Sequence, residues 1–293
     1  MGLDVNVVCR NYREDRVIPR FSRYLCDFLG WELSGKPIKG ADVYYLSGYF
    51  EIQMLPQNFA APMAAYFTHK EVDPPGNAKA RLFDRVAGLV DLRVVTASMY
   101  AVEVMEHGFT TKINPPVERH RFTIPKSRNQ KLTAGFSGYT YSNGRKGESL
   151  ARGLLSAAKN KKIEWVASGR GWPVKTVRYP WAELPAFYQS LDVLVVTALV
   201  EGVPMPPLEV LSCGGSVVIP RGVGLLDELP DVPGIHRYEK GDLTSLVAAF
   251  DAAVAMRSRI DRQALRDVTA PFSIFNWCVQ HRSAFEERFV WEI

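Results

Sequence analysis

The stretch that most constrains the fold is residues 192–220, where two apolar runs flank a loop, a proline-led helical turn and two glycines. Residues 192–197 read Asp-Val-Leu-Val-Val-Thr, which is typical of a parallel strand covered on both faces. The prolines at 206–207 suit the first turn of a helix, and the glycines at 214–215 suit its end. Strand, helix and strand in this order predict a parallel α/β sheet.

Two glutamates lie eight positions apart in this stretch. A binding crevice lies beyond the carboxyl end of such a strand, and Glu201 enters it from the loop. Glu209 belongs to the early turns of the helix, so its side chain is expected to tilt back toward the crevice. Two acceptor-only carboxylates suit the vicinal hydroxyls of a ribose and a hexose. The alternative is a pair of solvated glutamates on an ordinary strand–helix turn, because such a spacing also arises by accident.

With its Gly-x-Pro loop and Gly-Gly stop, the stretch resembles the Glu-x7-Glu motif of the retaining, nucleotide-sugar-dependent glycosyltransferases of the GT-B fold. These form the glycogen-synthase-like and mannosyltransferase-like group. The resemblance implies that Glu209 holds the donor ribose and Glu201 the hydroxyls of the transferred sugar. It also implies that the amides of Gly202 and Val203 face the sugar and phosphate. The chain departs from the family at Pro204, where a second glycine is usual and where proline removes a backbone donor.

Residues 131–150 resemble the family's first donor-domain strand, its glycine turn at Gly138 and the Lys-Gly opening of the next helix. The resemblance implies that Lys146 contacts the diphosphate. Tyr139 occupies the position after the turn glycine where the family often has an arginine, and Arg145 either substitutes for it or is a solvated surface charge. A pair of cations would neutralise the negative charge that develops on the departing nucleoside diphosphate. The sequence contains no metal-binding motif that would supply this charge instead.

Two further features belong to the expected donor side. Gly169 closes an apolar strand, and such a turn admits a nucleotide base or phosphate close to the backbone. Residues 178–192 resemble the family's short helix before the Glu-x7-Glu strand, where Tyr179 or Trp181 could stack on a base. The alternative is that these aromatic rings belong to the core.

Repeated strand and helix signals over 293 residues predict a GT-B arrangement of two Rossmann-like α/β domains that face a cleft, with a compact N-terminal domain. The expected layout is an acceptor-side domain over 1–116, a linker over 117–130, a donor-binding domain over 131–270, and a C-terminal helix over 271–293 that packs back toward the N-terminal domain. In the first half the patterns predict strands near 5–9, 42–46, 63–68, 92–96 and 110–113 and helices near 19–29 and 99–107. The resemblance is strong over 131–230 and only topological before that.

The acceptor side is marked by five arginines, where the family commonly has a glycine-rich turn: Arg10, Arg13, Arg16, Arg20 and Arg23. They suggest an anionic acceptor, although a helix-period apolar stripe in the same segment means that some of them point to water. His69 closes an apolar strand and matches a position where the family commonly has a cleft histidine that touches the transferred sugar. A lone strand-end histidine is otherwise a structural residue.

The net charge of +5 agrees with a polyanionic partner but does not require one, since diphosphate binding alone demands basic residues. Four cysteines without ligand-like spacing, no signal peptide and no apolar run of membrane-spanning length predict a cytoplasmic protein with reduced thiols. The oligomeric state stays open.

The sequence thus predicts a metal-independent, retaining hexosyltransferase that moves a sugar from a nucleoside diphosphate sugar to an acceptor hydroxyl. No cofactor is permanently bound. UDP-glucose is the favoured donor, with GDP or ADP as alternative nucleotides. The acceptor is a hydroxymethylated DNA base, a saccharide, a lipid or a protein. The predicted catalytic residues are Glu201, Lys146, Arg145 and His69, and the predicted donor-binding residues are Glu209, Gly202, Val203, Gly138, Tyr139, Gly169 and Tyr179. The competing hypothesis is a non-catalytic protein that binds a nucleotide sugar or a polyanion such as nucleic acid.

Overall fold

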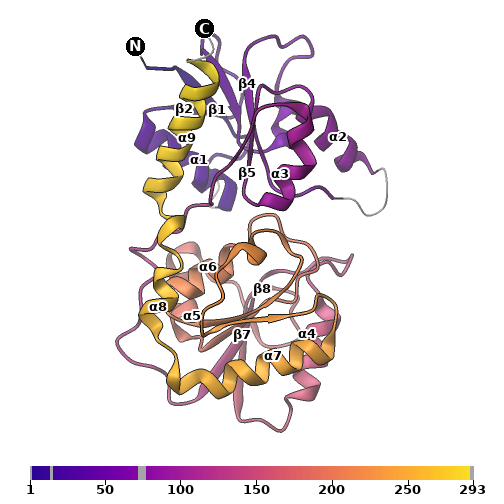
Figure 1. Ribbon diagram of the computed structural model, residues 1–293, viewed down its shortest axis with the longest axis vertical. Coiled ribbons are helices and arrows are strands. Elements are labelled where there is room, and N and C mark those ends of the chain that lie inside the picture. Colours follow the sequence, from indigo (N-terminus) through magenta and orange to yellow (C-terminus); the bar gives the residue numbers. More distant parts are fainter. Residues whose placement is uncertain (1, 14–15, 72–76, 291–293) are drawn as a thin grey trace. The chain divides into compact units, whose positions relative to one another are not determined.

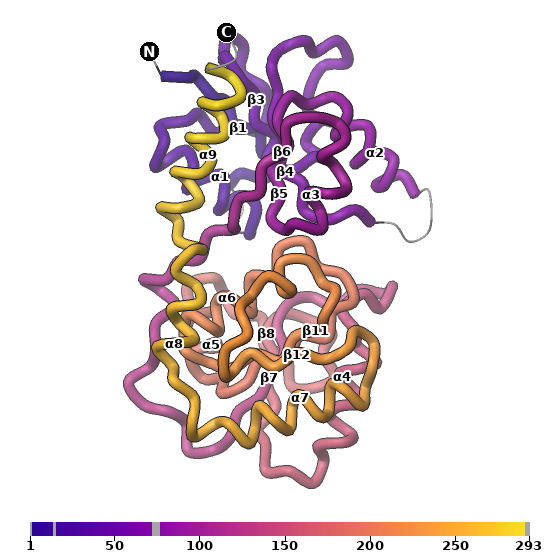
Figure 2. Tube along the Cα trace, viewed as in Figure 1, coloured from indigo at the N-terminus to yellow at the C-terminus, as the bar shows by residue number. Residues whose placement is uncertain are grey.

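The computed structural model describes residues 2–13, 16–71 and 77–290. The chain divides into two compact units, which Figures 1 and 2 colour along the sequence. The first unit comprises Met1–Pro116 with Ile274–Ile293, and the second comprises Val117–Ser273. Residues 117–130 therefore belong to the second unit, and the helix that ends the chain belongs to the first.

The first unit is built on a six-stranded parallel sheet of order β2-β1-β3-β4-β5-β6. Its strands are β1 (Val5–Val8), β2 (Glu32–Ser34), β3 (Val43–Leu46), β4 (Met63–Phe67), β5 (Leu92–Val95) and β6 (Thr110–Lys112). Its helices are α1 (Val17–Leu29), α2 (Ala78–Ala87), α3 (Ser98–Val104) and α9 (Ile274–Phe289), with 3-10 turns η1 (Tyr49–Met54) and η2 (Met105–His107).

The C-terminal helix α9 completes the core of the first unit and lies beside α1 (Figure 1). The buried ring of Trp277 packs against Phe21 of α1 and Tyr66 of β4, with centroids 5.3 and 5.7 Å apart. One turn later the His281 imidazole lies 3.0 Å from the Tyr45 hydroxyl of β3. Complete burial lowers the pKa of His281 to about 3, so this imidazole is neutral in the folded chain.

The second unit holds another six-stranded parallel sheet, of order β12-β11-β10-β7-β8-β9. Its strands are β7 (Leu132–Tyr139), β8 (Ile163–Arg170), β9 (Thr176–Val177), β10 (Val193–Val195), β11 (Ser216–Pro220) and β12 (Ile235–Tyr238). Its helices are α4 (Glu148–Ala157), α5 (Leu184–Ser190), α6 (Met205–Ser212), α7 (Leu243–Met256) and α8 (Arg262–Asp267). Four 3-10 turns connect them, η3 (Trp181–Glu183), η4 (Gly224–Glu228), η5 (Arg257–Arg259) and η6 (Ala270–Phe272).

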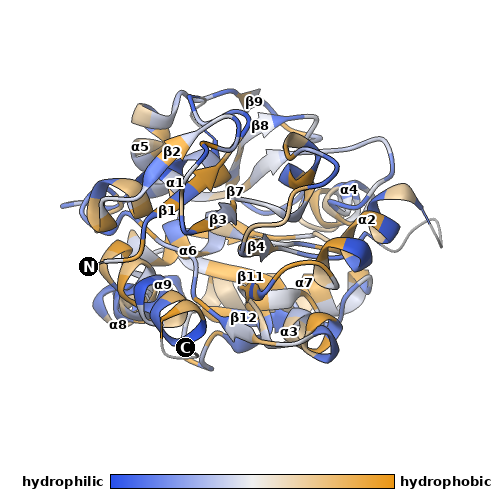
Figure 3. Ribbon diagram, turned by 90° about the horizontal axis from the view of Figure 1, so that it is seen from above, coloured by the Kyte–Doolittle hydropathy of each residue, from blue (hydrophilic) through white to orange (hydrophobic). Residues whose placement is uncertain are grey.

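The strand order of the second unit fixes where a ligand can bind. Strands β10 and β11 are fully buried and mostly apolar, as the colouring of β11 in Figure 3 illustrates. The chain order runs outward from β7 in one direction through β8 and β9 and in the other through β10, β11 and β12. In such sheets the crevice lies outside the carboxyl ends of the strands at the point where the order reverses. That point here is the junction of β7 and β10.

Candidate active site

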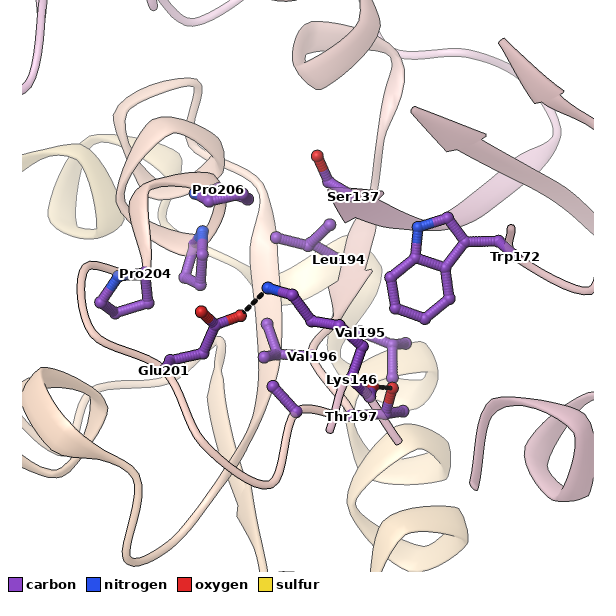
Figure 4. A pocket seen from close by; sticks show the side chains of 12 residues that line it. Ser137, Lys146, Trp172, Leu194, Val195, Val196, Thr197, Glu201, Pro204 and Pro206 are labelled. Atoms are coloured by element: carbon purple, nitrogen blue, oxygen red, sulfur yellow. Dashed lines mark hydrogen bonds and ion pairs between the residues drawn. The ribbon is translucent and has the colours of Figure 1, made fainter. Parts of the chain in front are cut away.

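A pocket lies at this junction, and all of its lining residues belong to the second unit (Figure 4). Its lining comes from the end of β7, the loop before α4, the turn after β8, the end of β10, the loop that follows β10 and the first turn of α6. The lining residues are Ser137, Lys146, Trp172, Leu194, Val195, Val196, Thr197, Ala198, Glu201, Pro204, Pro206 and Pro207. The pocket therefore lies where the strand order predicts a binding crevice.

Two of the predicted catalytic residues meet in this pocket as an ion pair. The ammonium of Lys146 donates a hydrogen bond to Oε1 of Glu201, and both side chains are mostly buried, at 14% and 17% exposed (Figure 4). A charged pair in such a setting retains more of its attraction than one in open solvent, because less water screens it. The pair places a cation and an anion at the carboxyl edge of the sheet, within reach of a single ligand.

The backbone around Lys146 explains the Lys-Gly pair in the sequence. The Thr197 hydroxyl donates to the Lys146 carbonyl at 2.6 Å, so the loop before α4 is fastened to the end of β10. Gly147 has φ +69°, and a Cβ there would lie 2.0 Å from the Thr197 carbonyl oxygen. No other residue fits without moving the loop, so the glycine positions the lysine.

A second pair of glycines brings β7 and β8 together at their carboxyl ends. Gly138 and Gly169 are register partners, and a Cβ on Gly169 would lie 2.1 Å from the Gly138 carbonyl oxygen. The same oxygen accepts a hydrogen bond from Nε1 of Trp172 at 2.8 Å. A Cβ on Gly138 would lie 3.8 Å from Nζ of Lys146. The predicted glycine turn thus borders the pocket, whereas the contribution of Trp172 was not predicted.

Tyr139 and Arg145 lie outside the pocket lining. The Arg145 guanidinium stacks on the Tyr141 ring at 4.1 Å, and its backbone carbonyl accepts from the Leu199 amide at 2.8 Å. Tyr139 is 39% exposed at the end of β7. The structure thus brings Lys146 into contact with Glu201.

Glu209 is 2% exposed on α6, which begins at Met205. Burial, reinforced by the nearby Glu209 carboxylate, raises the pKa of the Cys213 thiol to about 12. Gly202 is buried and Val203 half-buried in the loop before α6. These three residues are not part of the pocket lining, to which the same stretch contributes Glu201 and the prolines.

The remaining predicted donor and sugar contacts lie apart from the pocket lining. The Tyr179 ring is half-buried and stacks on Phe187, with centroids 5.1 Å apart, so the core covers one of its faces. His69 belongs to the first unit, where its Nε2 lies 3.9 Å from Oε1 of Glu71.

The arginine-rich segment follows β1 in the first unit, and residues 14–15 within it lie outside the described residues. The Arg10 amide donates to Oε1 of Glu51 at 3.2 Å, while its side chain is 45% exposed. Glu51 itself is 3% exposed, and burial raises the pKa of its carboxyl. No local motif marks Glu51, which lies near the carboxyl ends of β1 and β3 only because the sheet places it there.

Among residues 2–13, 16–71 and 77–290, no group of three or more histidine, cysteine or acidic side chains could hold a metal ion. Over the same ranges, every helix is too short or too polar to cross a bilayer.

No family model and no curated protein matches the sequence, whereas solved structures match it over most of its length. Sucrose-phosphate synthase from Thermosynechococcus elongatus is 16% identical with a TM-score of 0.69, over 93% of this chain and 77% of that one. Anabaena HepE in complex with UDP and glucose is 10% identical with a TM-score of 0.75, over 97% of this chain and all of that one. A glycosyltransferase from Rickettsia africae ESF-5 is 10% identical with a TM-score of 0.72, over 99% of both chains.

The chain therefore has the GT-B fold, built from two Rossmann-like units with one parallel six-stranded sheet each. This confirms the fold class predicted from the sequence. At these identities the matches establish the architecture.

Proposed function

We propose that this chain is a retaining glycosyltransferase that moves a sugar from a nucleoside diphosphate sugar to an acceptor hydroxyl. The observation that carries the proposal is the Lys146–Glu201 ion pair in the pocket at the junction of β7 and β10. Proteins of the same architecture support it, because sucrose-phosphate synthase and a glycosyltransferase are among the matches and HepE was solved with UDP and glucose. We assign donor binding to the second unit and acceptor binding to the first.

Lys146 is the residue proposed to bind the diphosphate. Helix α4 begins two residues after it, and the free amides of a helix N-terminus favour an anion at this place. A diphosphate that accepts the Lys146 hydrogen bond in place of Glu201 would release the Glu201 carboxylate. This carboxylate could then accept hydrogen bonds from sugar hydroxyls. The ammonium would also stabilise the negative charge that grows on the leaving diphosphate. One residue would thus serve both donor binding and bond cleavage.

Glu209 is proposed to hold the ribose, with UDP favoured over GDP and ADP as the nucleotide. Its burial suits a carboxylate that accepts hydrogen bonds from a diol, since each oxygen then gains a donor. The amides of Gly202 and Val203 are the remaining loop donors, because Pro204 has none. Attack on the same face as the leaving group, assisted by the diphosphate, would need no carboxylate nucleophile.

The acceptor is proposed to bind the first unit. The Arg10 side chain is 45% exposed and favours an acceptor with anionic character, whereas Arg20 is buried at 6% exposed and is not available to an acceptor. A hydroxymethylated base in DNA fits that character, and saccharide, lipid and protein acceptors remain alternatives. His69 is proposed to touch the transferred sugar.

Release of the nucleoside diphosphate from UDP-glucose, GDP-glucose and ADP-glucose tests catalysis without knowledge of the acceptor, because water can take the place of the acceptor hydroxyl. Turnover with one donor that disappears in Glu201→Gln supports the proposal. Tight binding of a nucleotide sugar without any turnover, with or without candidate acceptors, would instead support a non-catalytic binding protein.

A further inference from the structure

An exposed tyrosine, two residues after the pocket-lining Ser137, is flanked by two arginines. Tyr139 ends β7, and the guanidinium carbons of Arg170 and Arg178 lie 5.4 and 5.9 Å from its ring centroid. Arg170 is the register partner of Tyr139 at the end of β8, and Arg178 directly follows β9. Three strands therefore converge on one ring at the carboxyl edge of the second sheet.

This cluster, defined as Tyr139, Arg170 and Arg178, adjoins the donor pocket. Tyr139 directly follows Gly138, whose Cβ position lies 3.8 Å from Nζ of Lys146, and Ser137 before it lines the pocket.

The charges of the cluster are not balanced within the described part of the chain. Over residues 2–13, 16–71 and 77–290, neither Arg170 nor Arg178 has a carboxylate within ion-pair distance. Arg121 offers a contrast, because it too stacks on a ring, that of Trp181 at 4.9 Å, but also donates to Glu118 at 2.9 Å. Arg121 has the partners of a structural arginine, whereas the cluster holds two like charges beside one exposed ring.

We propose that Arg170 and Arg178 form a binding site for a phosphate-type oxyanion at the mouth of the donor pocket, with Tyr139 holding both guanidinium groups in place. Planar guanidinium groups match the oxygens of a phosphate, and stacking on a ring reduces the side-chain freedom lost on binding. An anion between them would also relieve their mutual repulsion. The oxyanion belongs either to the donor diphosphate or to a phosphate of the acceptor. The first source rests on the proposed function.

The test is isothermal titration of the full chain with UDP, with uridine and, at saturating UDP, with inorganic polyphosphate. The double variant Arg170→Gln/Arg178→Gln is compared with Arg259→Gln. Arg259 is likewise exposed in the second unit, on η5, and its neighbour Arg257 bonds the carbonyls that precede β7, at the opposite end of that strand. A Tyr139→Ala variant tests the role of the ring, and Tyr139→Phe is its conservative partner.

We expect the double variant to lose about tenfold in affinity for UDP or for polyphosphate, while Arg259→Gln changes neither by more than about twofold. A loss confined to UDP, with uridine unchanged, identifies the donor diphosphate. A loss confined to polyphosphate identifies a phosphate on the acceptor. Unchanged affinities for both, or no binding of either by the unmodified chain, would overturn the site. Normal UDP binding by the unmodified chain, with the affinities for both UDP and polyphosphate unchanged in the double variant, would overturn this inference and leave the proposed function standing.

Discussion

The carboxyl edges of the two sheets differ in how their polar groups are arranged. In the second unit Lys146 and Glu201 face each other across a pocket, and glycines with positive φ bring the strand ends close together. In the first unit Glu51 is buried where it accepts from the Arg10 amide, and the Arg10 side chain is 45% exposed. Under the proposed function, the donor site is preformed and the specificity of the acceptor site depends on exposed charge.

The largest expected effect falls on Lys146. Lys146→Ala should lower sugar transfer by about 10²–10³-fold, because it removes the cation proposed to stabilise the leaving diphosphate. The steady-state rate of nucleoside diphosphate release from the donor measures this loss of activity. Lys161→Ala is the matched control, since Lys161 also pairs with a carboxylate of this unit, Asp251, but near the surface. We expect Lys161→Ala to change the rate by less than about twofold, because an exposed ion pair contributes little free energy. Equal rates for the two variants would remove Lys146 from the mechanism.

The glycine contacts predict the next largest effect, on stability. Gly169→Ala should destabilise the second unit by about 3 kcal/mol, because φ +109° is strained for alanine and the new methyl group would meet the Gly138 carbonyl at 2.1 Å. Gly241→Ala is the control, since φ is +85° there but nothing lies within 4 Å, and it should cost only about 1 kcal/mol. Urea unfolding measures both. Equal costs would show that the approach of β7 and β8 is not tight.

The stability of the first unit should decrease at acidic pH because of its buried histidine, His281. The pKa of His281 is about 3 in the folded chain and about 6.5 when unfolded, so the unfolded chain binds the proton first as the pH falls. The contribution of His281 to the free energy of unfolding is therefore fully present above pH 6.5 and falls as the pH drops toward 3. About 2 kcal/mol of it is lost at pH 5. Urea unfolding followed at pH 7 and pH 5, on the unmodified chain and His281→Gln, measures this. The same pH dependence in both chains would contradict the assignment.

The smallest expected effect concerns Arg10. Arg10→Gln should weaken acceptor binding by about threefold and reduce its dependence on salt, because the side chain is exposed and screened. The Michaelis constants for acceptor and donor at two ionic strengths measure this, and only the acceptor value should move. A change in the donor value instead would place Arg10 at the donor and erase the proposed division between the units.

Much of the fold could be predicted because most strands are apolar runs ended by glycine or polar residues, as at residues 192–197. The structure shortens that strand to Val193–Val195, since Thr197 turns away to hold the Lys146 carbonyl. Strand β2 was missed because its three residues are partly exposed and show no alternation. Helix α2 was missed because only the Asn77 cap, which accepts from the Ala80 amide, marks its start.

The meeting of Lys146 and Glu201 could be anticipated from motifs, because both follow strands whose carboxyl ends lie at the reversal of the strand order. The approach of Trp172 could not, since it depends on the turn at Gly171, whose φ is +87°. The arginines beside Tyr139 were missed for a similar reason. Arg170 and Arg178 come from two strands, and only the register places them around one ring.

The most direct test of the donor site is a thermal-shift measurement with UDP, GDP, ADP and TDP on the unmodified chain and on Glu209→Ala. A nucleotide that binds the folded chain at about one hundred times its dissociation constant should raise the melting temperature by roughly 5 °C or more. We predict such a rise with one nucleotide, UDP first, and its loss in Glu209→Ala. The absence of a shift with all four nucleotides, or an equal shift in Glu209→Ala, would contradict a donor site formed around Lys146, Glu201 and Glu209.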